Sequence, residues 1–220
     1  YTSGTTNILH ENFQELREEC VSLLGIGDND LVVDIGSNDG TLLSKFEAGG
    51  HNGREETTTM CLIPVVAESV SIPVIAAGGI GSGKTMAAAF ALGAEGVQIG
   101  SRFVVTPEST AHINFKNAIV DANEGATELT LKELTPVRLM KNKFYHKIQD
   151  AYSNNASNIE LKEILGRARA KIGMFEGDLD EGELEIGQIS SAISAIKPAH
   201  LIVEEIMQEF HLTISQLQKY

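Results

Sequence analysis

The stretch IPVIAAGGI, residues 72–80, decides the fold class that the sequence predicts. It begins with a short apolar run that is typical of a buried strand, and the glycines after it indicate a loop. The alanine-rich segment 84–93 predicts a helix that ends at Gly93, and residues 95–100 predict a second strand. Strands that alternate with helices across short glycine loops favour parallel pairing, so we expect an α/β fold.

The same pattern of a strand followed by a glycine loop occurs earlier in the chain, and a different, mostly helical pattern follows later. LVVDI at 31–35 predicts another short buried strand that leads into a glycine loop. Beyond Pro107, charged helical patterns indicate a separate helical lobe, and Pro198 begins a last amphipathic helix. The predicted helices of the lobe span 108–122, 142–152 and 158–173, with short extended stretches around ELTLKEL and VRLM.

Composition narrows the classes of function. The chain has 220 residues, a formal net charge of -13 and 17 basic against 30 acidic side chains. Such a field repels phosphate backbones and excludes nucleic acid as a partner. The two cysteines form neither a disulfide framework nor a zinc motif. The apolar runs are far shorter than the roughly 20 residues that a membrane span needs. The N-terminus also has no signal-peptide features, so the sequence predicts a soluble cytoplasmic protein with no membrane partner.

Three glycine loops carry the functional hypotheses. The first, GGIGSGKT at 78–85, has the spacing of a P-loop and lies between a strand and a helix, as that motif requires. A P-loop enzyme also needs a later strand that ends in Asp or Glu to hold magnesium. LVVD at 31–34 precedes the loop, and LIVEE at 201–205 falls in the predicted last helix. Another phosphate ligand is therefore favoured over a nucleoside triphosphate, and a turn that only packs is the alternative.

The second loop, VVDIGSNDG at 32–40, resembles motif I of S-adenosylmethionine-dependent methyltransferases. Asp34 would end the strand, and the glycines would let the backbone approach the cofactor. YTSGTTNILHENFQELREEC is similar to the segment before that motif in sugar C-methyltransferases, so the resemblance covers residues 1–46. An acidic residue closing the next strand is missing, because Glu55 and Glu56 follow no strand-like run. A methyltransferase remnant is one alternative function.

The third hypothesis rests on a longer set of sequence segments, which includes the start of the first loop. From Glu47 onward the chain resembles the C-terminal half of the FMN-dependent family that contains nitronate monooxygenases, formerly 2-nitropropane dioxygenases, and enoyl-acyl-carrier-protein reductase II. The matching segments are EAGGHNG (47–53), T-x-x-x-L-I-P-V-V (58–66), IPVIAAGGI (72–80), MAAAFALGAEGVQIGSRF (86–103), GQISSAI (187–193) and IKPA (196–199).

This resemblance implies a partial TIM (β/α)8 barrel that contains only the C-terminal strands. It divides the chain into a methyltransferase-like fragment at 1–46, a partial FMN-binding barrel at 47–106 and 187–220, and a helical substrate lobe at 107–186. A complete barrel has eight strands in about 250 residues, and the family-like part supplies about three. An open arc of strands exposes an unpaired edge, so we expect homo-oligomerisation or aggregation. Alternatively, LVVDI replaces a missing strand and completes a small four-stranded sheet.

The resemblance also assigns the residues that bind the cofactor. Barrel phosphate sites are built from the loops after strands seven and eight, where backbone N–H groups converge. Gly78 and Gly79 follow the first of these strands, and Gly100 and Ser101 follow the second, so these four are expected to bind the FMN phosphate. Gln188 resembles a family glutamine near that phosphate, and its alternative role is that of a helix N-terminal residue.

His51, in the setting GGHNG, matches the active-site histidine of the family and is the expected catalytic residue. It would either take a proton from a nitroalkane carbon or orient a substrate carbonyl or the cofactor. The substrate is expected to be a small molecule, either a nitronate or an enoyl thioester, with NAD(P)H as the electron donor in the second case. A non-catalytic fusion product is the remaining alternative.

Overall fold

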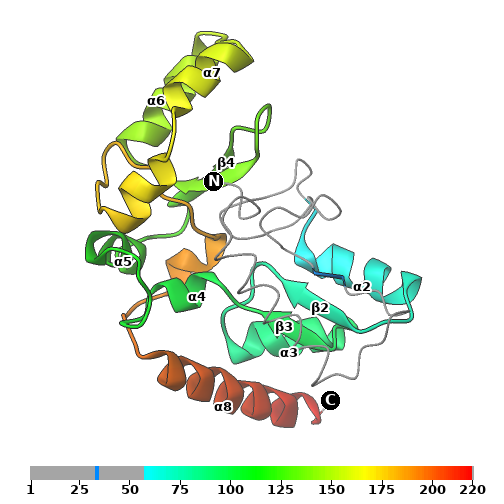
Figure 1. Cartoon of the computed structure of the whole chain (residues 1–220). Helices are drawn as coiled ribbons and strands as arrows, with labels where there is room; N and C mark the ends of the chain where they lie inside the picture. The colour runs from blue at the N-terminus through cyan, green and yellow to red at the C-terminus, as the bar shows by residue number, and fades with distance from the viewer. Residues whose placement is uncertain (1–32, 35–56, 220) are drawn as a thin grey trace, which may run out of the picture.

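The computed structural model describes residues 33–34 and 57–219 of the chain (Figure 1). A small parallel sheet and its helices form one part, and a mostly helical lobe forms the other. Residues 1–32 and 35–56, which include the glycine loop at 35–40, lie outside the described residues.

The sheet has three strands in the order β1-β2-β3. Parallel pairing joins β1 to β2 and β2 to β3, so the predicted parallel α/β fold is confirmed. The strand expected from LVVDI is present as the direct neighbour of β2. Within the described residues the sheet stays open and no closed barrel is formed. The strands are β1 (Val33–Asp34), β2 (Val74–Ala77) and β3 (Gly96–Gln98).

Two helices pack against this sheet. α2 (Thr59–Ser69) leads into β2, and α3 (Gly83–Ala91) connects β2 to β3. α3 forms because alanine favours helix and because Ser82 and Thr85 make a capping box, in which the Thr85 amide donates to the Ser82 hydroxyl oxygen at 3.2 Å. The core between sheet and helices consists of Ile63, Ala76, Ile80, Ala89 and Ala94.

The lobe follows β3 and agrees with the sequence in most of its elements. Two predicted helices are shorter than expected. The helix predicted over 108–122 begins at Ile113, and the one predicted over 158–173 ends at Leu165, because Gly166 takes a φ of 64°. The elements are α4 (Ser101–Val104), α5 (Ile113–Val120), the antiparallel strands β4 (Thr127–Thr130) and β5 (Val137–Met140), α6 (Lys143–Ser153), α7 (Asn158–Leu165), and the single π-helical turn η2 (Lys171–Phe175).

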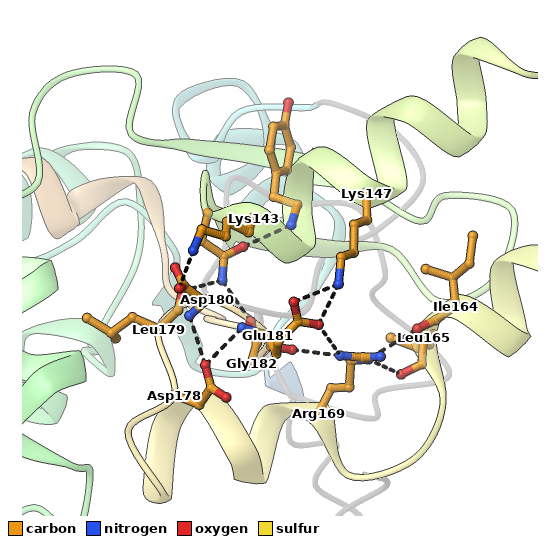
Figure 2. A network of polar contacts seen from close by, with 12 residues as sticks. Lys143, Lys147, Ile164, Leu165, Arg169, Asp178, Leu179, Asp180, Glu181 and Gly182 are labelled. Atoms are coloured by element: carbon orange, nitrogen blue, oxygen red, sulfur yellow. Dashed lines mark hydrogen bonds and ion pairs between the residues drawn. The ribbon is translucent and has the colours of Figure 1, made fainter.

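A polar network holds the acidic turn 178–182 against two helices of the lobe (Figure 2). Asp178 Oδ1 accepts hydrogen bonds from the amides of Asp180 (3.0 Å) and Glu181 (2.9 Å), which holds the pKa of its carboxyl below the usual range. Lys143 of α6 pairs with Asp180. Lys147 pairs with Glu181, and this contact is the main reason that the pKa of Glu181 is also lowered.

Arg169 closes the network from the other side. Its Nε donates to the carbonyls of Ile164 (3.1 Å) and Leu165 (2.8 Å) at the end of α7, and its Nη1 donates to the carbonyl of Glu181 (2.8 Å). One guanidinium therefore caps a helix end and fixes the acidic turn, and it also lies 4.7 Å from the ring centroid of Phe144.

We expect the replacement of Asn142 by alanine to be the most destabilising polar substitution in this network. The Asn142 side chain caps α6 by accepting from the Tyr145 amide at 2.9 Å, and it donates to the carbonyls of Leu179 and Gly182, both at 2.8 Å. Loss of the cap and of two donors should lower the free energy of unfolding by about 2–3 kcal/mol.

Denaturant titration followed by circular dichroism measures this change. Ser157→Ala is the matched control, because Ser157 caps the exposed start of α7 without bridging to another segment. The control should cost about 1 kcal/mol. Equal losses in the two variants would show that the contacts of Asn142 with the acidic turn contribute nothing.

The last helix, α8 (Ala199–Leu217), crosses α3 at the edge of the molecule (Figure 1). The rings of Phe90 and Phe210 lie with their centroids 5.4 Å apart. A Cβ atom on Gly83 would lie 2.2 Å from the backbone nitrogen of Phe210, so glycine permits a direct contact between the backbones of the two helices. In the described part of the chain, no helix is both long and apolar enough to cross a bilayer.

Candidate functional site

The two glycine turns that were expected to bind phosphate lie at the same edge of the sheet. Ala77, the last residue of β2, is the register partner of Gln98, the last residue of β3. Gly78 and Gly79 follow the first strand directly, and Gly100 and Ser101 follow the second after one intervening residue. The structure thus brings these four predicted residues to neighbouring positions, because carboxyl ends of parallel strands meet at one edge.

The backbone conformation of the first turn requires glycine. Gly78 and Gly79 have φ values of 101° and 67°, which lie in the left-handed region that other residues rarely adopt. The carbonyl of Gly78 accepts a hydrogen bond of 3.0 Å from the Thr59 hydroxyl, which ties this turn to α2. This contact and the two left-handed glycines together define the shape of the turn.

Three amides of these turns have no acceptor in the part of the chain that the structure describes. None of the described residues accepts a hydrogen bond from the amide of Gly79, Gly100 or Ser101. Gly100 precedes the short helix α4, and a Cβ atom placed on it would meet nothing within 4 Å. Backbone N–H groups without a partner at such a position are suited to an anion.

A cavity of about 770 Å³ opens beside the first of these turns and extends to Arg102, which follows the second. Gly79 and Gln188 line it, so two of the predicted residues share the cavity itself. Gln188 is also the first residue of a short 3-10 helix, η3 (Gln188–Ala192), so it occupies the helix N-terminal position that was considered as its alternative role. The amide of Gly187 donates to the Ser101 hydroxyl at 3.2 Å, which joins η3 to the turn after β3.

Arg102 is a functional candidate that the sequence reasoning missed. It follows Ser101 directly, lines the cavity and is 16% exposed. Its Nη2 donates to Glu205 Oε2 of α8 at 3.2 Å, and its buried Nε has no partner among the described residues. The available signal was the GSRF segment, in which a basic residue follows the two residues that were assigned to the phosphate.

Two carboxylates of α8 also face this cavity. Lys197 and Arg102 hold the pKa of the Glu205 carboxyl below its usual range, mainly through the hydrogen bond from Lys197. Glu209, one turn later, accepts a hydrogen bond of 2.7 Å from the Gly83 amide at the start of α3. At its own N-terminus α8 is capped by Glu108, whose carboxylate accepts from the Ala199 amide at 3.1 Å.

The segment with P-loop spacing uses its amides within the chain. The amides of Gly81 and Ser82 donate to the Thr85 hydroxyl oxygen at 3.1 and 3.0 Å. Gly83 donates to Glu209, and the Lys84 ammonium lies 3.7 Å from the same carboxylate. These contacts fill the positions where a P-loop would bind its phosphates, and this agrees with the prediction that favours a different phosphate ligand.

His51, the expected catalytic residue, lies outside the described residues, and no contact is assigned to it. Within residues 57–219, no three His, Cys, Asp or Glu side chains gather in a way that could hold a metal ion. The described part of the site therefore consists of backbone amides, Gln188, Arg102 and the two carboxylates of α8.

Comparison with known proteins identifies one family. The family model described as nitronate monooxygenase matches residues 27–209. This match begins inside the segment that resembles methyltransferases, and no comparison supports the methyltransferase interpretation of residues 1–46. That interpretation is corrected: a strand, a glycine loop and a following helix start are shared by many α/β folds, so this pattern alone does not identify a methyltransferase.

Individual relatives agree with this match. A protein of Staphylococcus saprophyticus named "Probable nitronate monooxygenase" is 29% identical over 89% of this chain and 58% of its own length. One of the same name from Bacillus subtilis is 39% identical over 53% of this chain and 37% of its own length. The chain thus spans about half the length of the curated relatives that it matches.

Solved structures show the same relationship. FabK from Thermotoga maritima is 42% identical with a TM-score of 0.74, over 81% of this chain and 56% of FabK. Nitroalkane oxidase from Streptomyces ansochromogenes is 30% identical with a TM-score of 0.62, over 80% of this chain and 52% of the oxidase. The family model covers far more than half of the sequence, and the arrangement of strands and glycine turns agrees with it. The chain belongs to the nitronate monooxygenase family.

Proposed function

We infer that this chain contributes the phosphate-binding part of an FMN-dependent oxidoreductase of the nitronate monooxygenase or enoyl-acyl-carrier-protein reductase II type. One observation carries the proposal: two adjacent glycine turns have amides that donate to no described residue, and Gly79 of the first turn lines a cavity. Family membership supports the choice of a flavin over other phosphate ligands.

The residues present fit a phosphate monoester. The amides of Gly79, Gly100 and Ser101 supply donors, and the left-handed turn at Gly78 and Gly79 lets the backbone approach the ligand closely. Gln188 would add a side-chain amide from η3. Since the whole chain is acidic, this local set of donors must hold the anion.

Arg102 supplies a positive charge directly after the second of these turns. Its ion pair with Glu205 fixes one edge of the guanidinium. Because Lys197 pairs with the same carboxylate, the three groups together keep a net positive charge near the turn after β3. Arg102 is therefore proposed as a residue that positions this turn and favours an anion there.

Bound FMN would supply the electron-transfer chemistry, and the chain's own residues bind and orient it. His51 is proposed as the group that takes a proton from a nitroalkane carbon or orients the substrate carbonyl. A nitronate and an enoyl thioester are the two candidate substrates, and NAD(P)H is the proposed electron donor for the second. Relatives named as nitronate monooxygenase and nitroalkane oxidase agree with the first, and the relation to FabK agrees with the reductase branch.

The proposed architecture assigns residues 47–106 and 187–220 to a partial barrel and residues 107–186 to a substrate lobe. The solved relatives extend well beyond the aligned region, since the chain covers 56% of FabK. A half-built barrel would leave strand edges that another polypeptide can cover, so association of copies is proposed as well.

A titration of the full chain with FMN tests this function. We expect quenching of flavin fluorescence on binding. Riboflavin, which lacks the phosphate, should bind about 100-fold more weakly, because the contacts proposed for the described residues are all made to the phosphate. Equal affinity for FMN and riboflavin, or no binding of FMN, would contradict the proposal. Reduction of the bound flavin by a nitronate or by NAD(P)H, followed by its absorbance, then separates the two branches.

A further inference from the structure

We propose that Glu209 is a specificity-determining residue, because its carboxylate fills a second anion position next to the phosphate turns and thereby limits the cavity to a monophosphate. The inference rests on the proposed function, because it assumes that the cavity binds the phosphate of FMN. It then explains why that cavity would accept one phosphate group and not two.

The start of α3 is a position that favours anions. Helix α3 begins at Gly83 and runs to Ala91, and the residues before it have the spacing of a phosphate-binding loop. Amides at a helix N-terminus carry partial positive charge and bind anions. In this chain the anion is internal, since Glu209 Oε2 accepts from the Gly83 amide at 2.7 Å.

The same carboxylate also pairs with the ammonium group of the next residue of α3. Lys84 Nζ lies 3.7 Å from Glu209 Oε1. In a P-loop the corresponding lysine reaches the phosphates of the nucleotide. The Glu209 carboxylate therefore contacts both groups that a second phosphate would bind, namely the Gly83 amide and the Lys84 ammonium.

Packing places Glu209 at this position. Glycine at 83 lets the backbone of α8 contact the start of α3 directly, and the Phe90 and Phe210 rings pack against each other beside it. One helical turn earlier on α8, Glu205 is held by Arg102. Two successive acidic residues on one face of α8 thus contact the elements that follow β2 and β3.

A ligand with two linked phosphates would meet the Glu209 carboxylate, because Glu209 and Gly79 line the same cavity. Repulsion between like charges in a partly enclosed site disfavours such a ligand, whereas a monophosphate at the two turns avoids the contact. Discrimination by a fixed repulsive group is the physical basis of the proposed specificity.

Isothermal titration of the full chain with inorganic pyrophosphate tests the inference. Glu209→Ala should bind pyrophosphate about tenfold more tightly than the unmodified chain, since the Gly83 amide and Lys84 become available. Glu209→Gln removes the charge and keeps an oxygen on the amide, so it should gain about threefold. Glu204→Ala is the matched control, because it makes the same change in net charge at an exposed position of α8 outside the cavity.

Circular dichroism checks that each variant is folded, and the isosteric Glu209→Gln keeps the test valid if Glu209→Ala unfolds. No gain in either folded variant, or an equal gain in Glu204→Ala, would overturn the inference. Binding of FMN to the unmodified chain is measured separately. Its failure would contradict the proposed function alone, whereas a gain in pyrophosphate affinity would still support the role of Glu209.

Discussion

Gly79→Val should abolish the binding of FMN at micromolar concentrations. Gly79 has a φ of 67° and lines the cavity, and a β-branched residue cannot adopt that conformation without strain. The turn would have to change shape, and the Gly79 amide would leave its position beside the cavity. We expect the dissociation constant of FMN to rise about 100-fold or more, measured by quenching of flavin fluorescence.

Gly125→Val is the control for backbone strain. Gly125 has a comparable φ of 75°, and a Cβ atom there would meet nothing within 4 Å. It lies in the turn before β4 and does not line the cavity. Both variants should lose about 1–3 kcal/mol of unfolding free energy, but only Gly79→Val should lose FMN. Unchanged FMN affinity in folded Gly79→Val would remove this turn from the site.

Gly83→Ala should destabilise the fold more than any other small substitution discussed. Its Cβ would lie 2.2 Å from Phe210 N, 2.4 Å from Ile206 O and 2.6 Å from the carbonyl carbon of Glu209. These are backbone atoms, so no side-chain rotation can relieve the clash, and α8 must move away from α3. We expect a loss of about 3 kcal/mol in unfolding free energy by denaturant titration.

The same substitution at Gly100 provides the comparison. Gly100 has a φ of -101°, which alanine adopts readily, and its Cβ would have no neighbour within 4 Å. Gly100→Ala should change stability by about 1 kcal/mol at most, and in the stabilising direction. A loss in Gly83→Ala no larger than the change in Gly100→Ala would show that α8 is not held against α3 as the structure indicates.

Local patterns predicted the elements of the sheet. The apolar run at 72–77 and the alanine-rich segment after the glycine loop became β2 and α3, because burial and helix propensity act on residues close together in the chain. The predicted helix over 142–152 corresponds closely to α6 (Lys143–Ser153) for the same reason. Boundaries were less accurate in the lobe, where Gly166 ends α7 early.

Local sequence patterns did not predict the contacts between distant segments. Arg102 meets Glu205 and Gly83 meets Glu209 across more than a hundred residues. An amphipathic pattern shows that α8 has an apolar face, but it does not state which turn of α8 lies over which turn of α3. The P-loop spacing therefore gave no indication that Glu209 contacts the start of α3.

The sequence by itself determined the parallel α/β class, the glycine turns after two consecutive strands and the family, because strand propensity, left-handed glycines and motif order are properties of neighbouring residues. Only the tertiary structure decided that Arg102 contacts Glu205 and that a second carboxylate of the last helix occupies the start of α3. Strand register and helix packing bring together residues that no local pattern connects, since they depend on which surfaces are buried against each other.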